Sequence, residues 1–252
     1  MGLRRIFGPL WAFANLAFAC LLVLPWLATK PQSRVARGLE RLFFGWITKG
    51  FGLDVRCEGR AAPHALFIAN HISWADIPVL ASVLDADFVA KSEIRQWPLI
   101  GWLARRYNPV FIDRERRGRA GAHAAAVRQR LENNRSVILC PEGTTSVGTA
   151  ILPFRTSLFS AADNAAIVQP VVIRYLDRAG NALCTKRQRD VAWIDDDDLL
   201  SGAARMAREH IMVKLVFLPP MEASDFPDRK ALAEIAHAAM SKAYATTPNR
   251  PR

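Results

Sequence analysis

Two residue types that can share a proton, His71 and Asp76, stand five positions apart in the sequence. In a continuous helix, side chains at this spacing point about 140° away from each other, so they meet only if the backbone turns between them. The apolar run 65–70 precedes the histidine and predicts a strand, while Asp76 opens a helix-like run. A strand, a turn and a helix in this order would place the imidazole in a cleft. The carboxylate would then orient it as a general base.

The same segment also fits a purely structural interpretation. Asp76 before Ile77 and Pro78 resembles a helix N-terminus with proline in its first turn. Ser73 and Asp76 have the spacing of a capping box, although this would push Pro78 past the first turn, where proline costs a hydrogen bond. A catalytic histidine and a structural one therefore both stay open from this segment alone.

Short β-rich runs alternate with helical patterns after residue 50, which predicts an α/β fold with a mixed sheet flanked by helices. Expected strands are 53–57, 65–69, 88–90, 110–112, 137–139, 167–175 and 212–217. Expected helices are 77–83, 94–106, 119–133, 201–209 and 228–244. The acidic run 195–198 is expected to be a solvated loop before a helix.

Polar residues follow three of the expected strands. His71 follows the second, Arg114 the fourth, and the turn 140–144 the fifth, so the three turns can line one crevice beyond the sheet. Such a crevice suits a hydroxyl that attacks a thioester. His71 takes the proton, a backbone N–H near Gly143 or Thr144 stabilises the oxyanion, and Arg114 holds a phosphate or carboxylate. The alternatives are that Arg114 is surface charge and that 140–144 is a plain turn.

An apolar segment near the N-terminus predicts a membrane attachment. Residues 6–28 contain no charged residue, and their length matches the roughly 20 residues that cross a bilayer. Lys30 and Pro31 close the run without a cleavage pattern, which favours an uncleaved anchor over a signal peptide. The amphipathic stretch 34–47 predicts a second helix and hence a hairpin that spans the membrane or dips into one leaflet, or else an ordinary core-facing helix. We therefore expect membrane-associated helices in 1–50 and the α/β domain in 51–252.

Charge and cysteine content restrict the class of protein further. The formal net charge is +11, and much of the excess lies within 105–119. This favours an anionic lipid surface or a phosphorylated substrate over nucleic acid, because no aromatic-interleaved basic motif occurs; a solvated basic face is the alternative. The four cysteines show no metal spacing, and no nucleotide-binding, zinc-protease or serine-hydrolase motif is found. We expect no cofactor and no metal.

Four ordered blocks make the chain resemble the glycerolipid acyltransferases typified by 1-acylglycerol-3-phosphate acyltransferase. The family patterns are Asn-His-x-Ser-x-x-Asp, Phe-Ile-x-Arg, Phe-Pro-Glu-Gly-Thr-Arg-Ser and an apolar Val-Pro-Val-like strand. The similar blocks in this chain are Asn70 with His71, Ser73 and Asp76; Phe111-Ile112-Asp113-Arg114; Cys140-Pro141-Glu142-Gly143-Thr144-Thr145-Ser146; and Gln169-Pro170-Val171-Val172-Ile173.

The resemblance implies a role for each block. His71 would be the general base and Asp76 its orienting partner. The implied substrate-binding residues are Asn70, Ser73, Arg114, Glu142, Gly143 and Thr144. The resemblance also implies an acyl-CoA or acyl carrier protein donor, a lysolipid acceptor, and attachment to the bacterial inner membrane with the active site facing the cytoplasm. No metal or nucleic acid is implied.

Two departures from the family pattern concern the acceptor. Thr145 stands where an arginine is usual, and the glycine that often opens the second block is missing around Asn108 and Pro109. Arg155 would compensate for the missing cation as a further substrate-binding residue, or the acceptor is of another kind.

Three functions remain open. The leading hypothesis is acylation of lysophosphatidic acid to phosphatidic acid, and the alternative acceptor is a lyso-ornithine lipid. A non-catalytic basic membrane-binding protein is the alternative of another class. The sequence leaves the acyl-chain length, the choice of donor and the oligomeric state open.

Overall fold

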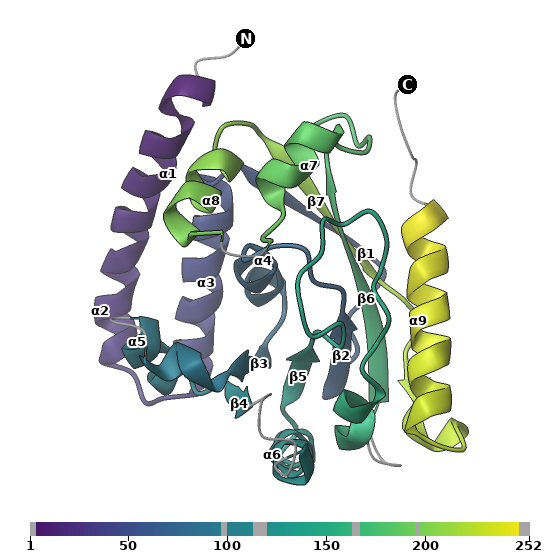
Figure 1. The fold of residues 1–252 in the computed structure, drawn as a ribbon. Helices are drawn as coiled ribbons and strands as arrows, with labels where there is room; N and C mark the ends of the chain where they lie inside the picture. Colours follow the sequence, from purple (N-terminus) through teal and green to yellow (C-terminus); the bar gives the residue numbers. More distant parts are fainter. Residues whose placement is uncertain (1–3, 97–99, 113–119, 163–166, 195–196, 247–252) are drawn as a thin grey trace.

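The computed structural model describes residues 4–96, 100–112, 120–162, 167–194 and 197–246 (Figure 1). Within these residues an eight-stranded mixed sheet has the order β1-β7-β6-β2-β5-β3-β4, and β8 pairs with β6. The strands are β1 Leu53–Glu58, β2 Ala65–Ala69, β3 Ala86–Lys91, β4 Val110–Ile112, β5 Ser136–Leu139, β6 Ile167–Leu176, β7 Ile211–Phe217 and β8 Met221–Glu222.

Strand β2 lies at the centre of the sheet, between β5 and β6, and is parallel to both. Phe67 pairs in register with Ile138 of β5 and with Gln169 of β6. Every residue of β2 and β5 is buried, which explains their near-continuous apolar sequences. Because β2 and β5 are parallel neighbours, the residues that follow them emerge side by side at one edge of the sheet.

Helices cover both sides of this sheet. The α-helices are α1 Arg4–Ala19, α2 Val23–Leu27, α3 Arg34–Gly50, α4 Asp76–Val83, α5 Ile100–Tyr107, α6 Ala120–Glu132, α7 Thr185–Val191, α8 Leu199–Met206 and α9 Arg229–Thr246. The 3₁₀ helices are η1 Cys20–Leu22, η2 Ser92–Gln96, η4 Thr156–Ala161 and η5 Ala223–Asp225. Helix α9 packs against β6 on one side, and α3 and α4 lie on the other (Figure 1). The predicted α/β fold with a mixed sheet is confirmed.

The expected helix 94–106 is wrong as a single element. Its first part belongs to the 3₁₀ helix η2, and α5 begins only at Ile100. Gly101 explains the break, because a Cβ there would lie 2.4 Å from the carbonyl oxygen of Arg95. The chain folds back on itself so closely at this point that only glycine fits.

The N-terminal helices pack against each other as a hairpin. Asn15 of α1 lies against Gly50 of α3, where a Cβ would approach the Asn15 Cβ to 2.7 Å. The rings of Phe18 and Trp46 are 5.1 Å apart, and Trp46 Nε1 donates a 3.1 Å hydrogen bond to Asn15 Oδ1. Within the described residues, Phe7–Leu27 is the one helical stretch long and apolar enough to cross a membrane. The boundary expected between residues 50 and 51 falls between α3 and β1, and this division stays a prediction.

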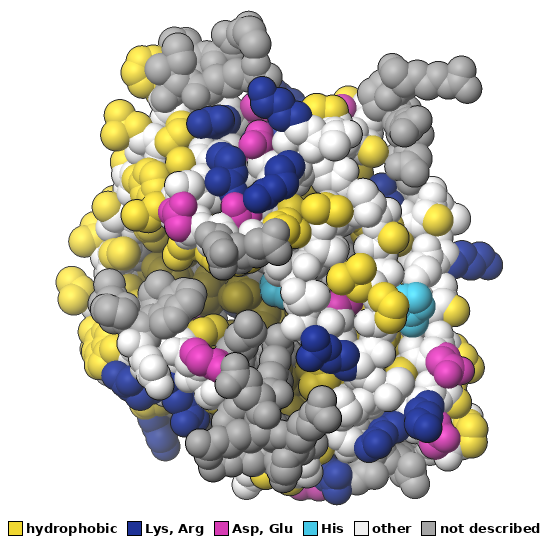
Figure 2. Space-filling model, viewed as in Figure 1, with side chains coloured by type: hydrophobic (Ala, Val, Ile, Leu, Met, Phe, Trp, Pro, Cys, Tyr) yellow, Lys and Arg dark blue, Asp and Glu magenta, His cyan; other side chains and the backbone are white. Residues whose placement is uncertain are grey.

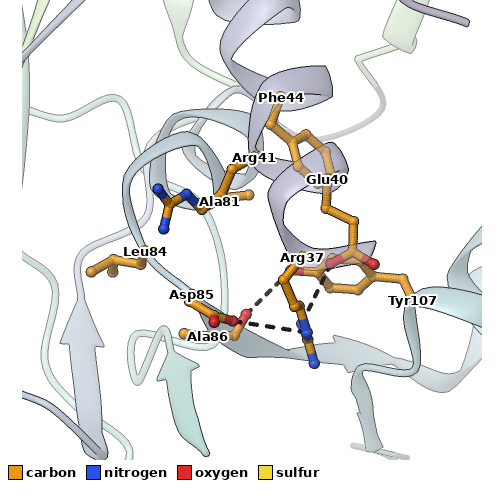
Figure 3. A pocket seen from close by; sticks show the side chains of 9 residues that line it. All are labelled: Arg37, Glu40, Arg41, Phe44, Ala81, Leu84, Asp85, Ala86 and Tyr107. Atoms are coloured by element: carbon orange, nitrogen blue, oxygen red, sulfur yellow. Dashed lines mark hydrogen bonds and ion pairs between the residues drawn. The ribbon is translucent and has the colours of Figure 1, made fainter. Parts of the chain in front are cut away.

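A buried ionic cluster fastens the hairpin to the sheet. Figure 3 shows Arg37 and Glu40 of α3 facing the turn that leads into β3. Arg37 Nη2 lies 2.6 Å from Asp87 Oδ1, and the fully buried Asp87 carboxylate also pairs with Arg130 and Arg135. Helix α3 is therefore core-facing on one side, as one of the two interpretations predicts.

Candidate active site

Asn70 fixes the end of β2 by bonding to the backbone of β6. Its Nδ2 donates to the Ile173 carbonyl oxygen at 3.1 Å, and its Oδ1 accepts the Ile173 N–H at 2.7 Å. Both residues are buried. The Asn70 amide therefore extends the hydrogen bonding of the sheet by one side chain and sets the point at which the chain leaves it.

The side chains of His71 and Asp76 meet across the turn that follows. His71 Nδ1 lies 2.8 Å from Asp76 Oδ2. The same oxygen accepts the backbone N–H groups of Ile72 at 2.7 Å and Ser73 at 2.9 Å. Asp76 is buried, whereas the His71 side chain keeps 23% of its surface exposed. With its Nδ1 proton on the carboxylate, the imidazole presents Nε2 as the atom that can accept a proton.

The helix-capping interpretation of Asp76 is only partly right. The N-cap of α4 is Ala75, and Asp76 is the first helical residue. Its carboxylate accepts the Ser73 N–H, as in a capping box, but the Ser73 hydroxyl accepts from Ala75 instead. The contact between His71 and Asp76 predicted from their spacing is therefore present. The catalytic role of the pair remains a prediction.

Glu142 joins the His71 turn to the loop after β5. Its Oε1 accepts the His71 N–H at 2.8 Å, and its Oε2 accepts the Leu152 N–H at 3.0 Å. Burial raises the pKa of Glu142 to about 7, although the two backbone amides favour the charged form. Both oxygens of this predicted acceptor-binding residue thus bind the backbone of the protein itself.

Gly143 adopts a backbone conformation that favours glycine, with φ of 73°. Its N–H donates to the Cys140 carbonyl oxygen at 3.2 Å, so this amide is already used within the turn. A Cβ on Gly143 would lie 2.6 Å from Arg155 Nε, so the guanidinium rests directly against this glycine. Arg155 and Thr144 are both exposed here. Within the described residues the Thr144 N–H has no backbone acceptor.

Thr145 points toward the connection between α7 and α8. Its hydroxyl donates to the carbonyl oxygen of Trp193, and the Trp193 N–H donates to the Ile72 carbonyl oxygen at 2.9 Å. This connection is therefore held against the turn that carries His71. The threonine that replaces the expected arginine uses its hydroxyl inside the protein.

The expectation of a solvated acidic loop is wrong for Asp197. Its carboxylate pairs with Arg189 at 2.8 Å and Arg205 at 3.1 Å, and only 10% of the side chain is exposed. These partners hold the pKa of Asp197 below its usual range, the Arg189 hydrogen bond first among them. Asp198 caps α8 by accepting the Ser201 N–H. Residues 195–196 lie outside the described part of the chain.

Tyr175 belongs to the site although no sequence motif marks it. Its hydroxyl donates to Asp76 Oδ1 at 2.7 Å from within β6. The single available signal is that a tyrosine inside a buried apolar strand needs a partner for its hydroxyl.

Two further expectations concern the contents of the site. Arg114 lies outside the described residues, so its predicted contact with the substrate is not placed. Among the residues that the structure does describe, no group of His, Cys, Asp and Glu side chains is arranged to hold a metal ion.

The surface beside α4 is hollowed. Figure 2 shows a hollow floored by hydrophobic side chains between the α1 side of the molecule and the helices α7 and α8. Lys and Arg side chains gather over α7 and α8, next to this hollow. Because Asp76 opens α4, the exposed imidazole lies near an apolar depression with cations at its edge.

Comparisons with known proteins agree with this geometry. The acyltransferase family profile matches residues 54–174. The lyso-ornithine lipid O-acyltransferase of Brucella abortus is 35% identical over 245 residues, which cover 92% of this chain and 91% of that protein. The 1-acyl-sn-glycerol-3-phosphate acyltransferase of Neisseria gonorrhoeae is 34% identical over 189 residues, 72% of each. The crystal structure of the 1-acyl-sn-glycerophosphate acyltransferase PlsC from Thermotoga maritima has a similar fold, with a TM-score of 0.68 at 21% identity, covering 96% of this chain and 95% of that one.

Proposed function

The chain belongs to the acyltransferase family, and from this premise we propose that it transfers a fatty acyl group from a thioester to the free hydroxyl of a lyso-ornithine lipid. The observation that carries the proposal is the His71–Asp76 pair, with Nδ1 held by a buried carboxylate and the ring exposed at Nε2. Such a pair is suited to taking a proton from a hydroxyl.

The proposed reaction uses the residues of the turn in sequence. His71 Nε2 takes the proton of the acceptor hydroxyl as its oxygen attacks the thioester carbonyl carbon. The carbon–oxygen bond forms, the carbon–sulfur bond breaks, and the imidazolium returns the proton to the leaving thiolate. Thr144 is our candidate for the oxyanion donor, because the Gly143 N–H is already bound to Cys140. Asn70, Ser73 and Glu142 would position the turn rather than touch the acceptor.

The identity of the acceptor rests on Thr145, Arg155 and the relatives. Thr145 supplies no cation, and its hydroxyl is bound to Trp193. Arg155 offers an exposed guanidinium beside Gly143, suited to a forked contact with a carboxylate. An ornithine head group that is acylated on its α-amino group carries a free carboxylate. The relative from Brucella abortus, which covers most of the chain, is named for this acceptor.

Lysophosphatidic acid is the second candidate acceptor. The relative from Neisseria gonorrhoeae is named for it, and the predicted phosphate contact of Arg114 would serve it. The sequence analysis ranks lysophosphatidic acid first, and we reverse the order because of Thr145. Acyl-CoA and acyl carrier protein both remain candidate donors, since each presents a thioester.

We also propose that the protein works at the bacterial inner membrane with its active site on the cytoplasmic side. The hairpin exposes large apolar side chains, for which a lipid phase is the natural partner. These side chains are Phe7, Leu10, Trp11, Phe18, Leu21, Leu24, Val35, Leu42 and Trp46. Hydrophobic side chains cover the α1 side of the molecule up to the hollow beside α4 (Figure 2). A lysolipid would thus have a short path from the membrane to His71.

The test is acyl transfer by the purified full chain in mixed micelles. Each acceptor, lyso-ornithine lipid and lysophosphatidic acid, is paired with acyl-CoA and with acyl carrier protein, and the product is measured by mass spectrometry. We expect kcat/KM for lyso-ornithine lipid to exceed that for lysophosphatidic acid at least about tenfold, the value of one charge-assisted contact. The opposite ratio would support the second candidate. Vesicle binding without any transfer would support the non-catalytic alternative.

A further inference from the structure

Asp76 is held from both of its oxygens, and only one side has been considered so far. On Oδ2 it carries His71 and two backbone amides, whereas on Oδ1 it accepts the hydroxyl of Tyr175 at 2.7 Å. We propose that Tyr175 is a positioning residue of the reaction, whose hydroxyl fixes the Asp76 carboxylate and thereby sets the direction and the proton affinity of the His71 imidazole. This inference rests on the proposed function of His71 as the base.

The surroundings of Tyr175 show that its oxygen is the unusual part of the residue. The strand around it is aliphatic and buried, including Ile173 and Leu176, so a phenylalanine ring would pack there equally well. A buried hydroxyl is costly unless it is hydrogen-bonded. The oxygen is therefore best explained by its bond to Asp76.

The protonation state of Tyr175 fits the same role. Burial, followed by the negative charge of Asp76, raises the pKa of Tyr175 well above its ordinary value, so the phenol keeps its proton and donates to the carboxylate. Such a charge-assisted bond is stronger than one between neutral groups.

Other titratable and charged groups face this pair from three elements. Glu142 comes from the loop after β5 and binds the His71 backbone, not Asp76. Tyr244 comes from α9, and its hydroxyl donates to the Gly148 carbonyl oxygen at 2.5 Å. Arg174, on β6, stacks on the Tyr244 ring at 4.2 Å. Within the described residues, Tyr175 is thus the one side chain that donates to Asp76 Oδ1.

The sign of the effect follows from the charge on Asp76. When the phenol is removed, Oδ1 loses its donor and the carboxylate charge is less stabilised. The carboxylate then attracts the imidazolium form of His71 more strongly. The imidazole should hold its proton to higher pH, and its ring should be less well aimed.

The experiment compares Tyr175→Phe with Tyr244→Phe. Each variant removes one buried phenolic oxygen, and both rings line the same small cavity behind the turn. The first measurement is the pH dependence of kcat/KM for acyl transfer. The second is the titration midpoint of the His71 ring, followed by NMR in protein with labelled histidine, with His71→Asn used to assign the signal. The second needs no substrate, so it decides the inference even if no lysolipid proves to be a substrate.

We expect Tyr175→Phe to lower kcat about tenfold with KM changed less than about twofold, as the loss of one hydrogen bond to a charged group predicts. The acidic limb of the profile and the NMR midpoint should both move upward by about half a pH unit or more. Tyr244→Phe should leave both unmoved. In an Asp76→Asn background, Tyr175→Phe should cost less than about twofold, because the charge through which it acts is gone.

The inference is overturned if the NMR midpoint in Tyr175→Phe equals that of the wild type, or if Tyr244→Phe moves it equally. A folded but inactive wild type whose midpoint still shifts on Tyr175→Phe would instead sink the proposed function and leave the role of Tyr175 toward the dyad intact.

Discussion

The carboxylates next to His71 are aimed by amides and hydroxyls of the protein before any substrate binds. Asp76 accepts from two backbone N–H groups and from Tyr175, and Glu142 accepts the backbone N–H groups of His71 and Leu152. Because these groups are fixed in the folded state, the imidazole needs little reorganisation when a hydroxyl arrives. At the scale of single residues, the site is organised around holding one ring in place.

Thr145→Arg tests the origin of the acceptor preference. The substitution restores a forked cation at the position where family members with a phosphate acceptor carry one. We expect kcat/KM for lysophosphatidic acid, relative to that for lyso-ornithine lipid, to rise about tenfold. Thr145→Val is the matched control, because it removes the bond to Trp193 without adding charge. An equal change of the ratio in both variants would contradict this assignment.

Glu142→Gln tests the buried carboxyl group through the pH dependence of stability. Folding raises the pKa of Glu142 from 4.5 to about 7, so the folded state holds a proton that the unfolded state has released. The contribution of this group is therefore fully present below pH 4.5 and is lost as pH rises to about 7, by a few kcal/mol at most.

The measurement is the thermal midpoint of wild type and Glu142→Gln across this pH range. The wild-type midpoint should fall relative to that of the variant as pH rises. A constant offset between the two curves would show that the Glu142 carboxyl titrates in the folded state as it does in the unfolded chain.

Sequence spacing predicts the contact between His71 and Asp76 because the two residues are local. The other contacts of the site are not accessible in this way. Glu142 is 71 positions from His71, and Tyr175 is 99 positions from Asp76. These pairs form only because the sheet order sets β2 between β5 and β6, and hydrophobic patterns give strand positions without giving strand order.

At the scale of elements, predictability follows the strength of the apolar pattern. Strands such as β2 and β5 are found because they are short apolar runs between turns. Helix α7 is missed because most of its residues are polar. Arg187 helps to hold this helix by donating to the carbonyl oxygens of Arg205 and Met206 at 2.8 and 2.9 Å. Such tertiary support leaves no periodic trace in the sequence.

Asp87→Asn tests how the hairpin is fastened to the sheet. The substitution removes the negative charge shared by Arg37, Arg130 and Arg135 and leaves the buried Arg37 underpaired. We expect unfolding to become easier by about 3 kcal/mol or more, as for other broken buried ion pairs.

Asp54→Asn is the control for Asp87→Asn, because its pair with Arg56 is more than half exposed and should be worth less than about 1 kcal/mol. Chemical unfolding in detergent measures both variants. If they lose the same stability, the ionic cluster shown in Figure 3 does not anchor the hairpin.

At the scale of the whole molecule, one side is built for a lipid surface. The hairpin exposes apolar side chains, and the chain carries a formal net charge of +11. Apolar contact and attraction to anionic lipids therefore act together. The hollow beside α4 opens next to this side (Figure 2), which gives the reacting hydroxyl and the acyl chain a common approach.

The double variant Leu10→Ser/Trp11→Ser tests this surface. Both side chains are exposed on α1, by 70% and 59%. We expect partitioning onto vesicles that contain anionic lipid to fall at least about tenfold, because two large apolar side chains no longer enter the bilayer. Ile235→Ser on α9 removes an exposed apolar side chain away from the hairpin and should change partitioning little. Equal losses would mean that the hairpin is not the membrane-facing side.

The central claim is that His71 is the base of an acyl transfer, and the most direct measurement is kcat/KM of His71→Asn with the best acceptor and donor. We expect a fall of ~10²–10⁴-fold, the usual contribution of a general base, with thermal midpoint and vesicle binding unchanged. His64→Asn, an exposed histidine whose positive φ asparagine tolerates, should retain wild-type turnover. If His71→Asn also turned over at the wild-type rate, the proposed mechanism would be wrong.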